Sequence, residues 1–136
     1  RAMRVDKMTL AALEATLRSY EAGSPEEIPV IAMLAAEPDA LRQKAEKLAA
    51  MLASAEIEAV ILPTEGRVGG GSVPNHVLPS YAVAFDGEVN KLEQTLRKGI
   101  LPIIGRIHEG KSLLDVRTLL ESDFETIVTS VREALA

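Results

Sequence analysis

The segment PIIGRIHEGKSLLDVRTL, residues 102–119 of this 136-residue chain, gives the clearest indication of fold class. Residues 102–107 and 113–119 are rich in apolar and β-branched side chains, a composition typical of strands. Between them, residues 108–111 combine a glycine with polar residues, as tight turns do. The segment therefore predicts an antiparallel β-hairpin.

Helical and extended patterns surround this hairpin on both sides. The predicted elements, in order, are helices at 5–22, 28–36 and 37–54, strands at 57–62 and 81–85, a helix at 88–98, strands at 102–107 and 113–119, and a helix at 124–135. Helices and strands mix, and the last two strands form a meander. We therefore expect an α+β fold with helices packed on one face of a mainly antiparallel four-stranded sheet.

The composition excludes several classes of protein. The chain has no cysteine, so disulfides, thiolate nucleophiles and cysteine-based metal sites are excluded. A net charge of −5 without a basic stripe argues against a free-standing nucleic-acid binder. No apolar run approaches the roughly 20 residues of a membrane helix, and no signal peptide opens the chain. We expect a cytoplasmic protein without a membrane partner.

The chain opens at Arg1, within what reads as a structured segment, and not at a methionine. We therefore expect it to be a piece of a larger protein that lacks a complete active site.

A glycine-rich loop is predicted at residues 66–80, with Gly69, Gly70, Gly71 and Ser72 at its centre. Backbone amides in such loops bind phosphate in some proteins. Here no Lys-Ser or Lys-Thr pair follows, and no helix begins directly after the glycines, as the known nucleotide motifs require. The pattern favours a tight, shaped loop that approaches another domain over a phosphate cradle.

Two arginines, Arg1 and Arg4, stand three residues apart before the first long helix. At this spacing two guanidinium groups can point the same way and bind one oxyanion. Two solvated charges at a chain end are the simpler interpretation, and spacing alone favours it.

The remaining polar residues suggest no catalytic or metal site. His76 and His108 have no ligand partner at a suitable spacing. Strand alternation places Asp115 and Arg117 on one face, where an ion pair or exposure to solvent accounts for both.

Several stretches, taken together and in order, resemble one family, the bacterial selenocysteine synthases (L-seryl-tRNA(Sec) selenium transferases). The matching stretches are residues 1–17 (RAMRVDKMTLAALEATL), 28–30 (IPV), 69–72 (GGGS), 78–80 (LPS), 102–107 (PIIGRI) and 113–118 (LLDVRT). The resemblance spans almost the whole chain and is specific as a set.

The resemblance implies a carboxyl-terminal domain of a pyridoxal-phosphate enzyme of the aspartate-aminotransferase-like class. The division it implies is a linking helix at residues 1–22 and an α/β sandwich at residues 23–136. The intact enzymes convert seryl-tRNA(Sec) to selenocysteyl-tRNA(Sec) with selenophosphate and contain further amino-terminal and cofactor-binding domains. The Schiff-base lysine would precede Arg1, and Lys7 stands at the wrong place in the motif to replace it. The fragment alone is therefore expected to bind no cofactor and to be inactive.

In this family an Arg-x-x-Arg motif at the position of Arg1 and Arg4 faces the active site, which implies that these residues hold the anionic selenium donor. The loop differs from the family pattern. That pattern has a glycine after Pro74 and an acidic residue near position 77, whereas this chain has Asn75 and His76. Two alternatives remain. One is a related pyridoxal-phosphate lyase for a small amino acid or sugar acid. The other is a module for homo-oligomer assembly, through an alanine-rich face such as that of Ala45, Ala49 and Leu52.

Overall fold

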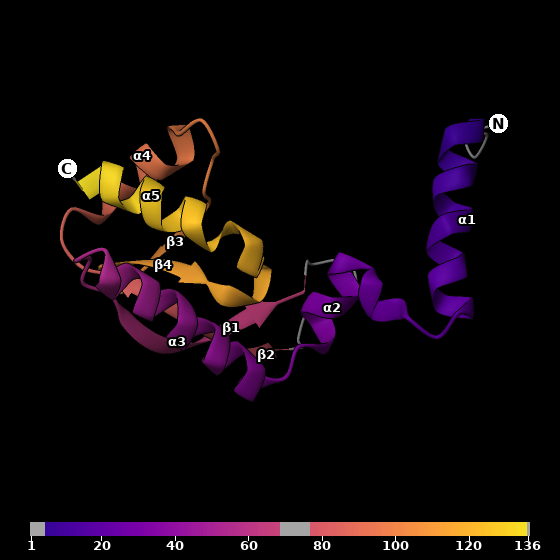
Figure 1. Cartoon of the computed structure of the whole chain (residues 1–136), viewed down its shortest axis with the longest axis horizontal. Helices are drawn as coiled ribbons and strands as arrows, with labels where there is room; N and C mark the ends of the chain where they lie inside the picture. Colours follow the sequence, from indigo (N-terminus) through magenta and orange to yellow (C-terminus); the bar gives the residue numbers. More distant parts are fainter. Residues whose placement is uncertain (1–4, 69–76, 136) are drawn as a thin grey trace. The chain divides into compact units, whose positions relative to one another are not determined.

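The computed structural model describes residues 5–68 and 77–135 (Figure 1). Contacts divide the chain into two compact units, residues 1–36 and 37–136. The first unit contains α1 (Lys7–Glu21), a 3-10 turn (Pro25–Glu27) and α2 (Pro29–Ala35). The second contains α3 (Pro38–Ser54), β1 (Val60–Arg67), β2 (Val77–Phe85), α4 (Val89–Lys98), β3 (Arg106–His108), β4 (Lys111–Asp115), the 3-10 turns η2 (Val116–Thr118) and η3 (Glu121–Asp123), and α5 (Phe124–Leu135).

Helix α1 has a residue that favours helix termination at each end. Asp6 caps its amino-terminal end, and Gly23 follows its carboxyl-terminal end with a φ of 76°, a conformation that glycine adopts without strain. None of its side chains is buried, and Met8 is 84% exposed. The apolar pattern that predicted this helix is therefore not used for packing within the first unit.

The second unit is built on a four-stranded antiparallel sheet in the order β1-β2-β4-β3. The hairpin of β3 and β4 turns at Glu109 and Gly110, both with positive φ, as predicted for residues 108–111. The order of helices and strands and the α+β fold class are confirmed.

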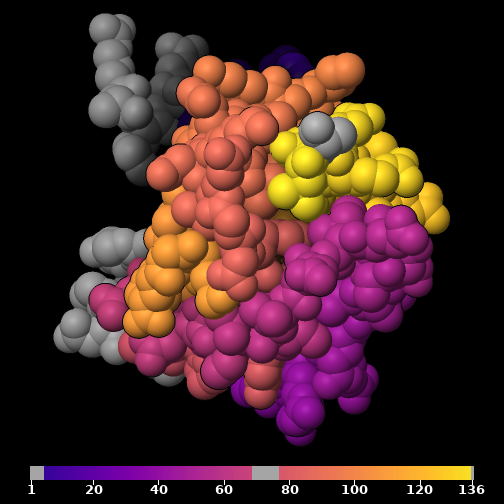
Figure 2. All heavy atoms as spheres, turned by 90° about the vertical axis from the view of Figure 1, so that its left-hand side faces the viewer, coloured from indigo at the N-terminus to yellow at the C-terminus, as the bar shows by residue number. Residues whose placement is uncertain are grey.

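Helices α3, α4 and α5 pack on this sheet, and α5 contacts both α3 and α4. Figure 2 shows the yellow α5 between the salmon segment that includes α4 and the magenta segment of α3. Each helix contributes a buried stripe, for example Leu48 in α3, Leu92 in α4 and Ile127 in α5. The sheet contributes Val83, Phe85 and Leu114, which are at most 2% exposed. Alternation along the strands directs these three side chains to one face.

The boundaries of the first two strands differ from the prediction. Strand β1 begins later than residue 57 and continues to Arg67, and β2 begins at Val77, so most of the described part of the predicted loop is strand. Pro79 lay in the predicted loop, and the first predicted strand stopped at residue 62, before Pro63; proline donates no ladder hydrogen bond. Here β1 is an edge strand, and β2 pairs with β4 only over residues 82–85, so neither proline interrupts a central ladder.

The last two strands are shorter than predicted. Residues 102–105 precede β3, and residues 116–118 form η2 instead of a strand. Asp115 ends β4 by accepting a hydrogen bond from the backbone N–H of Arg117, at 3.0 Å, which turns the chain.

Two of the three residues named for the alanine-rich face of α3 are buried within the second unit. Ala45 and Leu52 are 0% exposed, whereas Ala49 is half-buried. Among the described helices, none is both long and apolar enough to span a bilayer.

Candidate functional site

The residues predicted from sequence to form the site all lie outside the described part of the chain. These are Arg1, Arg4, Gly69, Gly70, Gly71 and Ser72. Their roles stay predictions.

The first turn of α1 directly follows the Arg-x-x-Arg motif. One carboxylate oxygen of Asp6 accepts hydrogen bonds from the N–H groups of Met8 and Thr9, at 2.8 and 3.0 Å. The other accepts the hydroxyl of Thr9 at 2.9 Å. These hydrogen bonds, those from Thr9 first, lower the pKa of the Asp6 carboxyl group. The capped turn gives α1 a defined first residue.

A cavity of about 560 Å³ lies on the face of the sheet opposite to Val83 and Phe85. Residues directly opposite one another in antiparallel strands share a face, so Leu62, Ala82, Ala84 and Leu113 lie on this second face. Strand and turn residues alone line the cavity, among the described part of the chain. We call it the open-face cavity.

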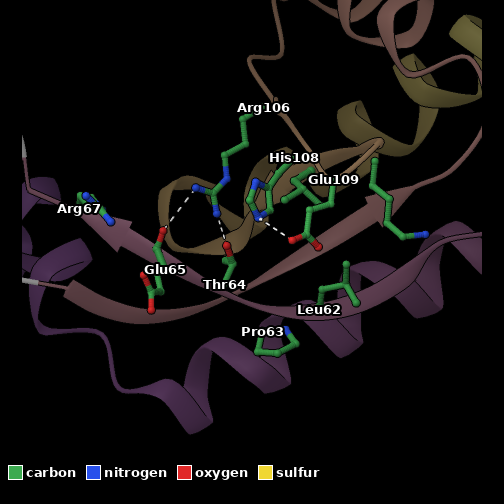
Figure 3. A pocket seen from close by; sticks show the side chains of 10 residues that line it. Leu62, Pro63, Thr64, Glu65, Arg67, Arg106, His108 and Glu109 are labelled. Atoms are coloured by element: carbon green, nitrogen blue, oxygen red, sulfur yellow. Dashed lines mark hydrogen bonds and ion pairs between the residues drawn. The ribbon is translucent and has the colours of Figure 1, made fainter.

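Arg106 of edge strand β3 reaches across the open face to the opposite edge strand. Its guanidinium donates to the hydroxyl of Thr64 and, at 3.4 Å, to the carbonyl oxygen of Glu65 (Figure 3). In a flat sheet, three spacings of about 4.8 Å would separate these edges by roughly 14 Å. The sheet therefore curls toward its open face, and Arg106 bridges the two edges of the trough.

His108 lies on the same face as Arg106, because the two are separated by one residue in a strand. Its Nε2 lies 3.8 Å from a carboxylate oxygen of Glu109. On the neighbouring strand, the ammonium group of Lys111 pairs with Asp86. Arg67 and Glu65 complete the charged rim. The cavity thus presents two nitrogen-rich side chains, Arg106 and His108, above apolar residues.

A buried polar cluster joins β2, β4 and η2. The hydroxyl of Ser80 donates to Asp115 at 2.6 Å, and a guanidinium N–H of Arg117 donates to the carbonyl oxygen of Pro79 at 2.6 Å. Arg117 is 7% exposed and packs beside Gly66 of β1. Of the two alternatives given for Arg117, solvent exposure is therefore wrong. Asp115 accepts a hydrogen bond from the backbone N–H of Arg117.

Two lysines of α3 hold the segment that follows this cluster. Lys44 donates to the carbonyl oxygen of Leu119, and Lys47 pairs with Glu121. Burial lowers the pKa of Lys44, against the opposing effect of Glu121 and Asp115. The hydrogen bond and charge of Lys47 lower the pKa of Glu121.

The described residues do not fit pyridoxal phosphate. A Schiff base requires a lysine whose amine is available in a pocket. Lys111 lines the open-face cavity with its ammonium paired to Asp86, and the half-buried Lys44 is bound to Leu119. Within residues 5–68 and 77–135, no three metal-ligating side chains lie close enough together to hold a metal ion.

Comparison with known families identifies the chain. A family model described as SelA, L-seryl-tRNA selenium transferase, matches residues 1–120, which is most of the chain. The chain belongs to the SelA family.

Curated relatives in the SelA family carry the name L-seryl-tRNA(Sec) selenium transferase. The protein of Desulfotalea psychrophila is 45% identical over 131 residues, covering 90% of this chain and 28% of the relative. Those of Moorella thermoacetica and Aquifex aeolicus are 41% and 39% identical, covering 99% and 100% of this chain. The chain spans 30% and 31% of these two relatives, so it corresponds to a portion of a larger protein.

The sequence patterns did not single out Arg106, His108 or Arg117 as site residues. The predicted strand ended at residue 107, so Arg106 was placed in a strand and His108 in the following turn. The approach of Arg106 to Thr64 depends on the strand order, which the sequence does not reveal.

Proposed function

We propose that this chain is the carboxyl-terminal part of a pyridoxal-phosphate-dependent transferase that converts seryl-tRNA(Sec) to selenocysteyl-tRNA(Sec) with selenophosphate. The observation that supports this proposal most is membership of the SelA family over residues 1–120. Relatives that are 36–45% identical carry the corresponding transferase name.

The cofactor is proposed to be bound by parts of the protein outside this chain. Pyridoxal phosphate supplies an electron sink when it is bound. The contribution of this chain is to bind the anionic parts of the substrates and to form one wall of the active-site cleft. Without the remaining domains, the chain is expected to have no transferase activity.

Arg1 and Arg4 are the proposed ligands of the anionic selenium donor. Guanidinium groups present planar pairs of N–H donors, which match the oxygens of a tetrahedral oxyanion. The motif immediately precedes the capped first turn of α1, whose Asp6 fixes where the helix starts.

The test is turnover of seryl-tRNA(Sec) by the full-length parent with Arg1→Ala or Arg4→Ala. Loss of one charged hydrogen bond costs about 1.5–3 kcal/mol, so activity should fall by about tenfold or more. The matched control is Arg18→Ala, because Arg18 is exposed and pairs only with Glu14 among the described residues. Wild-type activity in both variants would show that the two arginines are ordinary surface charges and not ligands of the selenium donor.

A related pyridoxal-phosphate lyase for a small amino acid or sugar acid is the second candidate. The departure at Asn75 and His76 from the loop pattern of the family favours it. An inactive wild-type parent in the selenium-transfer assay, with activity toward a small amino acid, would select this alternative. Homo-oligomer assembly stays a prediction that sedimentation of the intact parent tests.

A further inference from the structure

The open-face cavity contains a cationic group whose charge is not balanced nearby. Among the described residues, no carboxylate oxygen lies within ion-pair distance of the Arg106 guanidinium, whose two bonds go to a hydroxyl and a carbonyl oxygen. Figure 3 shows the Glu65 carboxylate directed away from Arg106. Arginine carries five N–H donors, so three remain for a ligand.

The guanidinium is also fixed in position. Arg106 spans the trough between β3 and β1, so its orientation does not have to be selected when a ligand binds. Preorganised donors bind more tightly, because less side-chain freedom is lost on binding. His108 extends from the same strand on the same face and offers a second nitrogen donor.

Two of the four other charged side chains that line the cavity have a charged or polar neighbour. Lys111 is paired with Asp86, and Glu109 lies beside His108. Leu62 and Leu113 supply apolar surface in the same cavity. A ligand that combines an oxyanion with a less polar portion matches this lining.

We infer that the open-face cavity binds a phosphate group of a substrate, with Arg106 as the principal donor and His108 as the second. The choice of phosphate as the bound group rests on the proposed function. The amino acid in a seryl-tRNA is an ester and has no free carboxylate, so phosphate is the anion that its RNA portion offers. The phosphate comes either from the RNA backbone or from the small selenium donor.

The first experiment follows the isotope-labelled 136-residue chain by NMR during titration with inorganic phosphate, a single-stranded RNA trinucleotide and L-serine. Phosphate or RNA should shift the signals of Arg106, His108 and Thr64. Tighter binding of RNA than of inorganic phosphate identifies the RNA backbone as the source, whereas tighter binding of phosphate identifies the small donor. No shift with either probe, or stronger shifts with L-serine, would overturn the inference.

Three variants separate binding from the structural bridge. Arg106→Gln should weaken binding by at least about tenfold, and Arg106→Lys should restore part of it, since both lysine and arginine are cationic. Thr64→Val removes the acceptor of the bridge and keeps the cation, so binding should stay within about threefold. An equal loss in Thr64→Val and Arg106→Gln would make Arg106 a structural residue only. Arg42→Gln on α3 is the matched control, because among the described residues the Arg42 side chain pairs only with Glu46.

The full-length parent distinguishes failure of this inference from failure of the proposed function. Arg106→Gln should raise the KM for the substrate that carries the phosphate by about tenfold. An active parent whose kinetics do not change in Arg106→Gln would overturn the phosphate site alone. Phosphate binding that depends on Arg106, in a parent without selenium-transfer activity, would retain the site and overturn the proposed function.

Discussion

The hydroxyl of Ser80 donates a 2.6 Å hydrogen bond to the carboxylate of Asp115, 35 positions along the chain. The same oxygen of Asp115 accepts the backbone N–H of Arg117. One carboxylate therefore links β2 to the point where β4 ends and η2 begins. Because Ser80 is 2% exposed, water does not replace this contact when the hydroxyl is removed.

Ser80→Ala should lower the free energy of unfolding by about 1–3 kcal/mol, because a partly buried carboxylate loses a donor. Urea denaturation of the chain measures this change. Ser122→Ala is the matched control, since Ser122 is exposed and, within the described part of the chain, its hydroxyl bonds only to its neighbour Asp123, at 3.3 Å. The control should change stability by less than about 0.5 kcal/mol. Equal effects in both variants would show that the Ser80–Asp115 bond does not stabilise the fold.

Arg117→Met should destabilise the chain by about 1.5–3 kcal/mol, the range for a hydrogen bond to a charged group. The variant keeps most of the buried alkyl volume but removes the donor to Pro79. Thermal unfolding followed by circular dichroism measures the effect. Arg132→Met on the exposed surface of α5 should stay within about 0.5 kcal/mol of the wild type. Unchanged stability in Arg117→Met would contradict a structural role for this buried guanidinium.

Gly105→Ala should destabilise the chain by about 1–3 kcal/mol through overpacking. A methyl group at this position would lie 2.9 Å from the carbonyl oxygen of Leu113 and 3.3 Å from a side-chain carbon of Leu114. Gly99→Ala provides the comparison, because its nearest contact would be an ordinary 3.5 Å. Gly99→Ala should be neutral or stabilising by up to about 1 kcal/mol, since it restricts the unfolded chain. The measurement is the midpoint of urea denaturation, and the reverse order would refute the close approach at Gly105.

The contribution of Glu121 to stability should depend on pH. Lys47 lowers the pKa of Glu121 in the folded chain below its ordinary value of 4.5. A carboxyl group with a lowered folded pKa stabilises above its unfolded pKa, and this stabilisation is lost as the pH falls through the folded pKa. The stability difference between wild type and Glu121→Gln should therefore be present at neutral pH and shrink below pH 4.5.

A double-mutant cycle checks the cause of this pH dependence. In a Lys47→Gln background, Glu121→Gln should have a smaller effect at neutral pH and a flatter pH profile. An unchanged pH profile in that background would assign the lowered pKa to a group other than Lys47.

The order of secondary-structure elements could be predicted from the sequence because each element has a strong local pattern. The stripe through Leu41, Leu48 and Leu52 predicted α3, and these residues are buried as expected. The strand boundaries could not be predicted, because proline has a different effect on an edge strand than in a central ladder. Pro79 was therefore placed in a loop although it lies in β2, and β1 continues through Pro63, beyond the predicted end at residue 62.

The open-face cavity could not be predicted from local patterns. Arg106 and Thr64 are 42 positions apart, and they meet because β2 and β4 occupy the centre of the sheet. The pairing order and the curl of the sheet arise from tertiary packing. The sequence analysis placed Arg106 in a strand and His108 in the turn, so it indicated neither the face that they share in β3 nor what lies opposite them.

The alanines at positions 82 and 84 have a consequence for how this surface can change during evolution. Both are fully buried on the strand beside β1, where they form a core cluster with Leu113 and Leu62. Leu62 and Leu113 line the open-face cavity, whereas the two alanines do not. Replacement of either alanine by valine or leucine would overpack this cluster and displace the two leucines. The shape of the cavity therefore depends in part on two residues that lie behind its lining, and substitutions there could change the ligands that a descendant of this protein accommodates.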